Sequence, residues 1–405
     1  MSGKWPGGFI TKTAPTVVGP VDGEGGSAPG IWTLGEVADY VKQGLWPKPV
    51  IPKELYIWGD NGNGQLGLGD VTDRSSPVQV GALTTWSKMA SGDRHSIATT
   101  SDGKLYSWGK GTNGRLGLGN TTDRSSPVQV GALTTWSETG AGQTFSMAIK
   151  TDGTLWAWGA NNSGQLGLDD TTDRSSPVQV NALTDWRNVC GGNLHTLAIK
   201  TDGTLWSWGN NGRGQLGLND TTNRSSPVQV GALTTWLSIS CGYRSSFGTT
   251  TDGKLYAWGY NSSGQLGQNN TTQRSAPIQV GALTTWLKVA GGYAHVVASK
   301  TDGTLWAWGN NAAGQLGLND QTNRSSPVQV GALTTWDKIA AGLYHTLAIK
   351  TDGTLWSWGR NGDGELGLNN TTYRSSPVQV GALTTWLKLP TIMTMSKSSL
   401  SLKQP

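Results

Sequence analysis

One phrase, RSSPVQVGALTTW from Arg74 to Trp86, decides how this chain folds, because close copies of it return along the sequence. The copies are fifty residues apart with no insertion or deletion, and they begin at Arg74, Arg124, Arg174, Arg224, Arg274, Arg324 and Arg374. A Trp-Gly pair keeps the same period, at Trp58, Trp108, Trp158, Trp208, Trp258, Trp308 and Trp358. Self-similarity at a fixed period of this size indicates a repeat architecture, in which each repeat is one small structural unit.

A single repeat predicts four short strands. Pro177–Val180 is rich in β-branched residues, and we expect it to be the first strand of a blade that continues with Trp186–Cys190 and His195–Ile199. The fourth strand, which in the preceding blade is Thr154–Trp158, follows a Thr-Asp-Gly turn such as Thr201–Gly203. Asp-Gly favours the tight hairpin turn, because that turn needs positive φ. Four strands per unit, repeated in seven units, predict a β-propeller.

The two ends of the chain are complementary parts of one blade. The array begins at Glu54–Trp58, in the place of a fourth strand, and it ends with Pro377–Val380 and Trp386–Leu389, a first and a second strand. A tail, Thr391–Leu402, stands where a third strand is due. We expect the tail to pair with Glu54–Trp58 and close the ring, which leaves no open edges. The sequence therefore predicts an all-β, seven-bladed propeller of four-stranded blades over residues 51–405, preceded by an extended arm with a short helix.

Two segments, VAGGYAHVVAS (Val289–Ser299) and LWAWGNNAAGQLGLND (Leu305–Asp320), resemble the repeat of the regulator of chromosome condensation family. The resemblance covers residues 54 to about 390, where Trp-Gly, Gly-Gln-Leu-Gly and Gly-x-x-His recur in register. It implies a seven-bladed propeller with one split blade. Family members include nucleotide-exchange factors for small GTPases, chromatin binders and domains of ubiquitin ligases, so the fold alone does not decide the function. All repeats here have one length, so no blade carries the inserted wedge that an exchange factor pushes into its GTPase.

The composition suits such a fold and excludes several partners. Glycine occurs 59 times and tryptophan 21 times, which favours short strands with tight turns over a helical core. The net charge of +5 comes without a block of basic residues, so nucleic acid is not predicted as a partner. No apolar stretch is long enough to span a membrane. Cys190 and Cys241 are expected to be small buried side chains rather than metal ligands or a disulfide framework.

The residues that could carry chemistry recur as fixed parts of the repeat. The histidine position is filled in other repeats by Phe145 and Ser245, which favours a partly buried histidine with a packing role over catalysis. The four histidines are His95, His195, His295 and His345. The aspartates of the Thr-Asp-Gly turns occur once per blade, so no two are placed for acid–base work. They are Asp102, Asp152, Asp202, Asp252, Asp302 and Asp352.

The seven arginines of the RSSP phrase are expected to bind nearby carbonyl or carboxylate groups. A ring of cations that binds an anion is the alternative. No P-loop, nucleophile elbow or cluster with metal-ligand spacing occurs. The sequence therefore predicts no catalytic residue, no metal and no cofactor.

Differences between the repeats point to one face of the ring. In an up-and-down blade the loops alternate between two faces, so the GALTT links and the Thr-Asp-Gly turns share one face. The other face holds the loops before the histidine position and the connections after Trp-Gly, where nearly all the variation falls. Tyrosine and arginine are favoured in binding patches, while neutral drift in exposed loops is the alternative. The candidate binding residues are Arg94, Lys110, Arg115, Arg213, Tyr243, Arg244, Tyr260, Tyr293, Tyr344, Arg360 and Tyr373.

The N-terminal fifty residues have a different pattern. Residues 1–31 are rich in glycine and proline and are expected to form an extended arm. Residues 32–50 predict a short helix, in which Thr33 and Glu36 form a capping box and Gly44 ends the helix. So short a helix needs a surface on which to dock. Its anchor residues are Trp32, Leu34, Val37, Val41 and Trp46.

The stretch GIWTLGEVADYVKQGLWP (Gly30–Pro47) resembles short segments of structural proteins from marine bacteriophages. This resemblance implies a virion protein of a tail, fibre or capsid, with other virion proteins bound through the arm and a host-surface molecule bound by the variable face. The alternative is a cytoplasmic regulator of the propeller family, such as an exchange factor for small GTPases or a chromatin-binding protein. An enzyme is not predicted, because only the versatility of the fold argues for one.

Overall fold

The computed structural model describes residues 52–390 and 396–405. Met1–Pro52 and Lys53–Pro405 are separate units, and the fold below is that of the second. The expected arm (1–31) and capped helix (32–50) lie outside the described residues. In the part of the chain that the structure describes, no helix is long and apolar enough to cross a bilayer.

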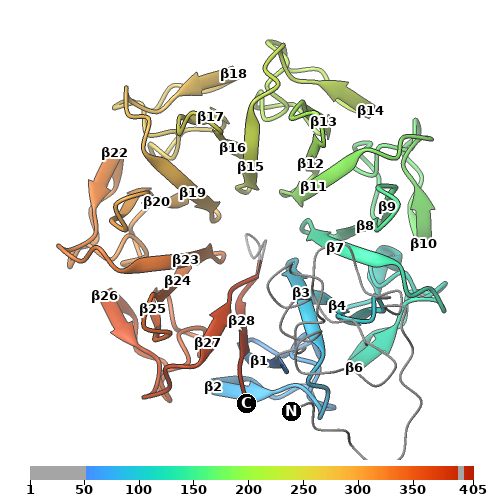
Figure 1. The fold of residues 1–405 in the computed structure, drawn as a ribbon, viewed down its shortest axis with the longest axis horizontal. Coiled ribbons are helices and arrows are strands. Elements are labelled where there is room, and N and C mark those ends of the chain that lie inside the picture. The colour runs from blue at the N-terminus through green and yellow to red at the C-terminus, as the bar shows by residue number, and fades with distance from the viewer. Residues whose placement is uncertain (1–51, 391–395) are drawn as a thin grey trace, which may run out of the picture. The chain divides into compact units, whose positions relative to one another are not determined.

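The unit Lys53–Pro405 consists of seven four-stranded antiparallel sheets in a ring, as predicted (Figure 1). In six complete blades the chain runs outward through four consecutive strands, the first of which lies nearest the centre. Blade 1 contains β3 (Trp86–Ser91), β4 (His95–Thr100), β5 (Leu105–Gly109) and β6 (Arg124–Gln129). A single 3₁₀ turn, η1 (Thr112–Gly114), lies between β5 and β6.

Blades 2 to 6 repeat this order. Blade 2 contains β7 (Trp136–Ala141), β8 (Phe145–Lys150), β9 (Leu155–Gly159) and β10 (Arg174–Gln179). Blade 3 contains β11 (Trp186–Gly191), β12 (His195–Lys200), β13 (Leu205–Gly209) and β14 (Arg224–Gln229). Blade 4 contains β15 (Trp236–Cys241), β16 (Ser245–Thr250), β17 (Leu255–Gly259) and β18 (Arg274–Gln279). Blade 5 contains β19 (Trp286–Gly291), β20 (His295–Lys300), β21 (Leu305–Gly309) and β22 (Arg324–Gln329). Blade 6 contains β23 (Trp336–Ala341), β24 (His345–Lys350), β25 (Leu355–Gly359) and β26 (Arg374–Gln379).

The closing blade joins the two ends of the propeller unit. From the centre outward it contains β27 (Trp386–Lys388), β28 (Ser398–Lys403), β1 (Glu54–Gly59) and β2 (Arg74–Gln79). The tail strand β28 runs antiparallel to β1, and Glu54 faces Lys403 at one end of the ladder. The predicted closure by the tail and the strand near residue 54 is confirmed. The tail strand β28 pairs with β27 and β1, and β1 pairs with β28 and β2.

The first strand of each repeat belongs to a different blade from the one predicted, and in the closing blade Arg74–Gln79 stands in place of Pro377–Val380. Pro177–Val180 was expected to open the blade of Trp186–Cys190, but the observed strand, Arg174–Gln179, is the outermost strand of blade 2 and pairs with β9, where Val178 faces Ala157. The cause is the polar connection after Trp-Gly, which turns the chain back alongside the strand it has just left. The GALTT link, rather than this connection, then crosses to the next blade. Sequence periodicity gives the spacing of strands but not which neighbours share a sheet.

Tryptophans fill the interfaces between blades. Trp158 is fully buried and donates its indole N–H to the carbonyl of Arg115 in blade 1, at 3.0 Å. Trp136 packs edge-on against Trp158, with ring centroids 6.4 Å apart. Gly117 has φ +70° and lies against the Trp158 ring, where an added Cβ would come within 2.8 Å of the indole nitrogen. The glycine of Gly-Gln-Leu-Gly therefore makes room for the tryptophan of the next blade.

The histidines join neighbouring blades. His95 is buried and its Nε2 lies 2.9 Å from the hydroxyl of Ser146, which itself donates to the Arg115 carbonyl at 2.8 Å. Since the hydroxyl donates to a carbonyl, it accepts from the imidazole, and the proton is assigned to Nε2. The same contact joins His195 to Ser246, His295 to Thr346 and His345 to Ser399. The histidines pack as expected, but they are fully rather than partly buried. Burial lowers the pKa of His95 to about 3.

The two cysteines lie across the interface between blades 3 and 4. The Cys190 and Cys241 thiols are both buried, and their Sγ atoms are 2.6 Å apart. Burial raises the pKa of the Cys241 thiol well above its usual value. They are small buried side chains, as the sequence predicts, and they face each other.

Candidate functional site

The loops separate onto two faces in the way the sequence predicts. The Thr-Asp-Gly turn lies beside the GALTT link, since the N–H of Trp136 donates to the carbonyl of Gly103 at 3.0 Å. On the other side, the N–H of Lys110 donates to the carbonyl of Arg94 at 2.8 Å, which ties the start of one variable connection to a variable loop. We call these the uniform face and the variable face.

Backbone hydrogen bonds run around the axis of the variable face. The N–H of Asp93 donates to the carbonyl of Gln143 at 3.2 Å, and the N–H of Asn193 donates to that of Tyr243 at 2.9 Å. Further around, the N–H of Tyr293 donates to the carbonyl of Leu343 at 3.2 Å. These bonds hold equivalent loop positions of consecutive blades side by side. A side chain at such a position therefore meets the side chains of its neighbours rather than standing alone.

Three tyrosines use this arrangement. Tyr243, Tyr293 and Tyr344 come from blades 4, 5 and 6 and form a continuous stack. The ring centroids of Tyr243 and Tyr293 are 4.4 Å apart, and those of Tyr293 and Tyr344 are 5.3 Å apart. Burial raises the pKa of Tyr293, and its two tyrosine neighbours raise it further, so this hydroxyl is neutral at physiological pH.

One arginine extends the stack, and a second arginine–tyrosine pair lies on the same face. The guanidinium of Arg244 lies over the Tyr243 ring at 5.1 Å, and that of Arg213, an exposed residue, lies over the Tyr260 ring at 5.2 Å. Among residues 52–390 and 396–405, neither arginine has a carboxylate partner within salt-bridge distance. Tyrosine rings with arginine above them present apolar area, hydrogen-bond donors and positive charge together. We call the six-residue patch the tyrosine arc; it consists of Arg213, Tyr243, Arg244, Tyr260, Tyr293 and Tyr344.

The other predicted binding residues are not part of the tyrosine stack, although the backbone N–H of Arg360 donates to the carbonyl of Tyr344 at 2.9 Å. Arg94 is half-buried and pairs with Asp93 at 3.6 Å, and Lys110 starts the connection that hydrogen-bonds to its loop. Arg360 binds Asp363 at 2.8 Å and also Glu365, so its charge is neutralised locally. Tyr373 is 47% exposed, on the connection that precedes β26.

One predicted binding residue is not displayed. Arg115 is 4% exposed, and its Nε donates to the carbonyl of Thr112 at 2.9 Å. Burial lowers its pKa. It occupies the glutamine position of Gly-Gln-Leu-Gly, where the backbone carbonyl binds the next blade's tryptophan. Arg115 differs from its equivalents in other repeats, but it is buried and therefore cannot contribute to a binding surface.

The remaining sequence predictions on sites concern the N-terminal segment and metals. The anchor residues Trp32, Leu34, Val37, Val41 and Trp46 lie outside the described residues. Within the described ranges, no group of three or more histidine, cysteine, aspartate or glutamate side chains is placed to hold a metal ion. Sequence reasoning did not find the tyrosine stack. Its only signal was tyrosine at adjacent loop positions of consecutive repeats.

Fold and repeat together define a propeller of the RCC1-like class. The chain belongs to this family, since the RCC1-like domain matches residues 53–298. The regulator of chromosome condensation (RCC1) repeat also matches residues 302–349 and 352–388. The family resemblance drawn from the repeat is thereby confirmed.

Several solved structures share the fold. Human WBSCR16 superposes with a TM-score of 0.77 at 19% identity, covering 87% of this chain and 99% of that chain. Prp20p from Saccharomyces cerevisiae, whose structure is described with its binding properties to Gsp1p and histones, gives a TM-score of 0.75 at 21% identity, with 87% and 92% covered. The yeast RCC1 (Prp20) bound to Kap60 gives 0.76 at 20% identity, with 88% and 89% covered. At these identities the likeness establishes the fold and nothing further.

A curated relative is similar over a shorter stretch. Ras guanine nucleotide exchange factor C from Dictyostelium discoideum is 45% identical over 53 residues, which is 13% of this chain and 4% of that protein. The chain thus spans a small part of this relative's length. None of the proteins named here is a virion component. The bacteriophage prediction gains no support from them and rests on the N-terminal segment alone, while the cellular alternative is the better supported of the two.

Proposed function

We propose that this chain is a cellular, non-enzymatic binding protein of the RCC1-like family that holds a protein partner against the tyrosine arc. The observation that carries the proposal is the stack of Tyr243, Tyr293 and Tyr344. Stacked tyrosines at the surface offer large, rigid contact area, and tyrosine and arginine dominate the binding energy of protein interfaces. Each comes from a different blade, so the surface exists only in the closed ring.

The charge of the tyrosine arc favours a partner with an acidic surface. Arg213 and Arg244 have no carboxylate partner among the described residues, and a guanidinium group is a cation. On the far side of the same face, Asp93 lies beside Arg94 and offsets it. An acidic partner is therefore attracted toward blades 3 to 6 and not toward blade 1.

The partner classes to test first come from the relatives. Prp20p is described with binding to Gsp1p and histones, and the slime-mould relative is a Ras exchange factor. A small GTPase is therefore the first probe, and a histone complex is the second, because histones are basic and the positive charge of the tyrosine arc disfavours them. Nucleotide exchange itself is the second candidate function, and the 53-residue likeness is what favours it. The equal length of all repeats argues against nucleotide exchange, because no blade contains an inserted wedge.

The test is a binding titration of the full chain with Gsp1p, a Ras-type GTPase and reconstituted histone octamers. We expect one of these partners to bind the wild type. The double variant Tyr293→Ala with Arg244→Ala should bind that partner about tenfold or more weakly, since buried interface tyrosines and arginines are each worth over 1 kcal/mol. The matched control is Tyr373→Ala, an exposed tyrosine on the same face but outside the arc. Equal binding by the arc variant would overturn the proposed site. Failure of the wild type to bind any of the three would overturn the proposed partner classes.

A separate assay decides the second candidate. Release of a fluorescent GDP from the bound GTPase is measured with and without the propeller. We expect release to be unchanged, because no element of the described residues projects from the ring as a wedge. Acceleration that is lost in the arc variant would establish exchange activity at the same surface.

A further inference from the structure

One position of the repeat is occupied by either aspartate or asparagine, and the two residues differ in what they do to the arginine of RSSP. The aspartates are Asp70, Asp170, Asp220 and Asp320. The asparagines are Asn120, Asn270 and Asn370.

In the aspartate repeats the carboxylate accepts hydrogen bonds from the amide of an asparagine nine residues earlier, from a backbone N–H and from the arginine. Oδ1 of Asp70 accepts the backbone N–H of Thr72 at 2.9 Å, and Oδ2 accepts Nη2 of Arg74 at 2.5 Å. The Thr72 N–H contributes most, and Arg74 contributes further, to holding the pKa of Asp70 below its usual value. The same ion pair forms at Asp170, Asp220 and Asp320, so four of the seven RSSP arginines are neutralised as the sequence predicts.

In the asparagine repeats the backbone N–H partner is kept and the arginine partner is lost. Oδ1 of Asn370 accepts the N–H of Thr372 at 3.0 Å, but its amide nitrogen is a donor and turns to the carbonyl of Leu368 at 2.9 Å. An amide nitrogen cannot accept from a guanidinium. The Arg374 side chain accordingly has no hydrogen bond or ion pair within the described ranges, and its Nε is buried without a partner. Arg124 keeps one weak contact, 3.4 Å from the carbonyl of Asp123.

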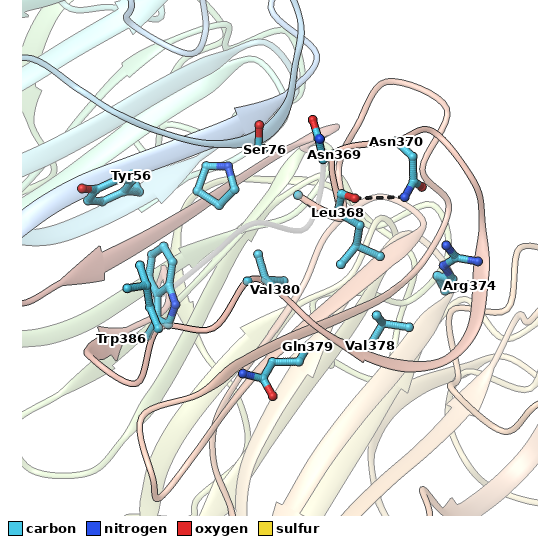
Figure 2. Close-up of a pocket in the computed structure, with 14 residues that line it drawn as sticks. Tyr56, Ser76, Leu368, Asn369, Asn370, Arg374, Val378, Gln379, Val380 and Trp386 are labelled. Carbon is cyan, nitrogen blue, oxygen red and sulfur yellow. Dashed lines mark hydrogen bonds between the residues drawn. The ribbon is translucent and has the colours of Figure 1, made fainter.

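The unpaired Arg374 lies in a groove between blade 6 and the closing blade. The groove has a volume of about 660 Å³. Figure 2 shows Arg374 at one end beside Asn370, with Tyr56 and Trp386 at the other end and Val380 between them. The lining is mostly apolar, so an arginine there is an isolated positive charge beside an apolar surface.

A second groove has the same composition. It lies between blades 1 and 2, has a volume of about 540 Å³ and is lined by Arg124 and Asn120 together with Leu118, Val128 and Trp136. The equivalent groove before blade 6 belongs to an aspartate repeat, and its lining does not include Arg324, which is held by Asp320. In the third asparagine repeat the groove is smaller, about 400 Å³, and Arg274 does not line it.

We propose that the grooves at Arg374 and Arg124 are binding sites for a small amphipathic anion, in which an oxyanion group pairs with the arginine and an apolar body lies on the groove floor. Arginine presents two parallel N–H groups that match a carboxylate, sulfonate or phosphate. Grooves of this volume match the usual size of small-molecule sites, which are apolar with a few polar groups that fix orientation. Because these repeats lack the internal carboxylate, the positive charge of the arginine is available to pair with an anionic group of a ligand.

The repeats supply the matched variants for the test. Asn120→Asp with Asn370→Asp restores the internal ion pair that four other repeats already contain, so the variant is expected to fold. Asn223→Asp with Asn323→Asp adds the same two charges to neighbouring connections, at a position where Asp73, Asp123 and Asp173 stand in other repeats. The two double variants have equal net charge and differ only in whether the groove arginines are neutralised.

The probe is 1-anilinonaphthalene-8-sulfonate, an apolar body with one sulfonate, whose fluorescence is titrated with the full-length protein. We expect the wild type and the Asn223/Asn323 variant to bind alike, and the Asn120/Asn370 variant to bind about tenfold or more weakly, as for loss of a charged hydrogen bond. Equal affinity of all three proteins would overturn the proposal.

Competition then distinguishes charge from apolar contact and identifies the source of the anion. Octanoate, N-acetyl-leucyl-aspartate amide and neutral octanol each compete with the bound probe. Displacement by either anion and not by octanol supports the site, and the stronger of the two anions indicates a fatty-acid-like or a peptide ligand. If octanol displaced the probe as strongly as octanoate, the arginines would not contribute to ligand recognition, and the proposal would be overturned.

Discussion

At the interfaces between blades the same side chains make the same contacts around the ring, whereas on the variable face equivalent positions hold different side chains. Trp158 and five of its equivalents donate to one backbone carbonyl of the preceding blade, and Trp358 is the exception. Tyr293 has the equivalents Asp93, Gln143 and Asn193, which make other contacts. The interfaces are close-packed and carry the stability of the ring, while the variable loops are free to change and can acquire a partner.

Removal of the tail strand should have the largest effect, because it breaks the interface that closes the ring. Deletion of residues 396–405 leaves β1 and β27 without β28, and we expect loss of cooperative unfolding in thermal melts followed by circular dichroism. Deletion of Gln404 and Pro405 alone keeps the strand and serves as the control. A cooperative melt near the wild-type temperature in the longer deletion would show that the ring does not depend on its closure.

Replacement of a single interface tryptophan should come next. Trp158→Ala removes a fully buried ring and its hydrogen bond, and we expect the free energy of unfolding to fall by about 3–5 kcal/mol. Trp156→Tyr is the control, since Tyr106 and Tyr256 fill that half-buried position in other repeats, and it should cost about 1 kcal/mol or less. Urea unfolding measures both. Similar losses in the two variants would contradict the assignment of stability to the interface.

The buried histidines predict a dependence on pH. The folded-state pKa is about 3 for His95, His195 and His345 and about 4 for His295, against 6.5 in the unfolded chain. The folded pKa is depressed, so the unfolded chain binds more protons, and the stability is fully present above about pH 6.5 and falls as the pH drops toward 4. Urea unfolding between pH 7 and pH 5 measures this loss before most carboxylates titrate.

A matched variant isolates one histidine. His295→Phe reproduces the natural Phe145, whose neighbour in the next blade, Thr196, is a threonine like Thr346. We expect the slope of unfolding free energy against pH to fall by about 1.4 kcal/mol per pH unit, the contribution of one proton. Stability at pH 7.5 should change little. An unchanged slope would mean that His295 is accessible to protons in the folded state.

Loss of a variable-face side chain should have the smallest effect on stability. Tyr373→Ala removes a side chain that is 47% exposed, and the free energy of unfolding should change by less than about 0.5 kcal/mol. Urea unfolding at pH 7.5 checks this. A loss above 1 kcal/mol would show that the variable face also supports the ring, and the contrast with the interfaces would then fail.

The candidate site was predictable in part. Comparison of repeats located the variable face and named all six residues of the tyrosine arc, because substitution accumulates where the backbone alone satisfies the fold. It also named Arg115, which is buried, and it did not separate the arc from Arg94, Arg360 and Tyr373. Those distinctions depend on which side chains meet across blades, and a fifty-residue period carries no information on that.

The sequence by itself determined the seven blades, the turn chemistry, the closure by the tail and the faces on which the loops lie. These follow from local pattern: the period, the Asp-Gly turns and the alternation of strands. Only the tertiary structure decided that Arg174–Gln179 belongs with the preceding strand, that the histidines bridge blades, and that three tyrosines form one stack. It also decided which RSSP arginines are paired. Each of these depends on contacts between residues far apart in sequence, whose distances are set by the closed ring.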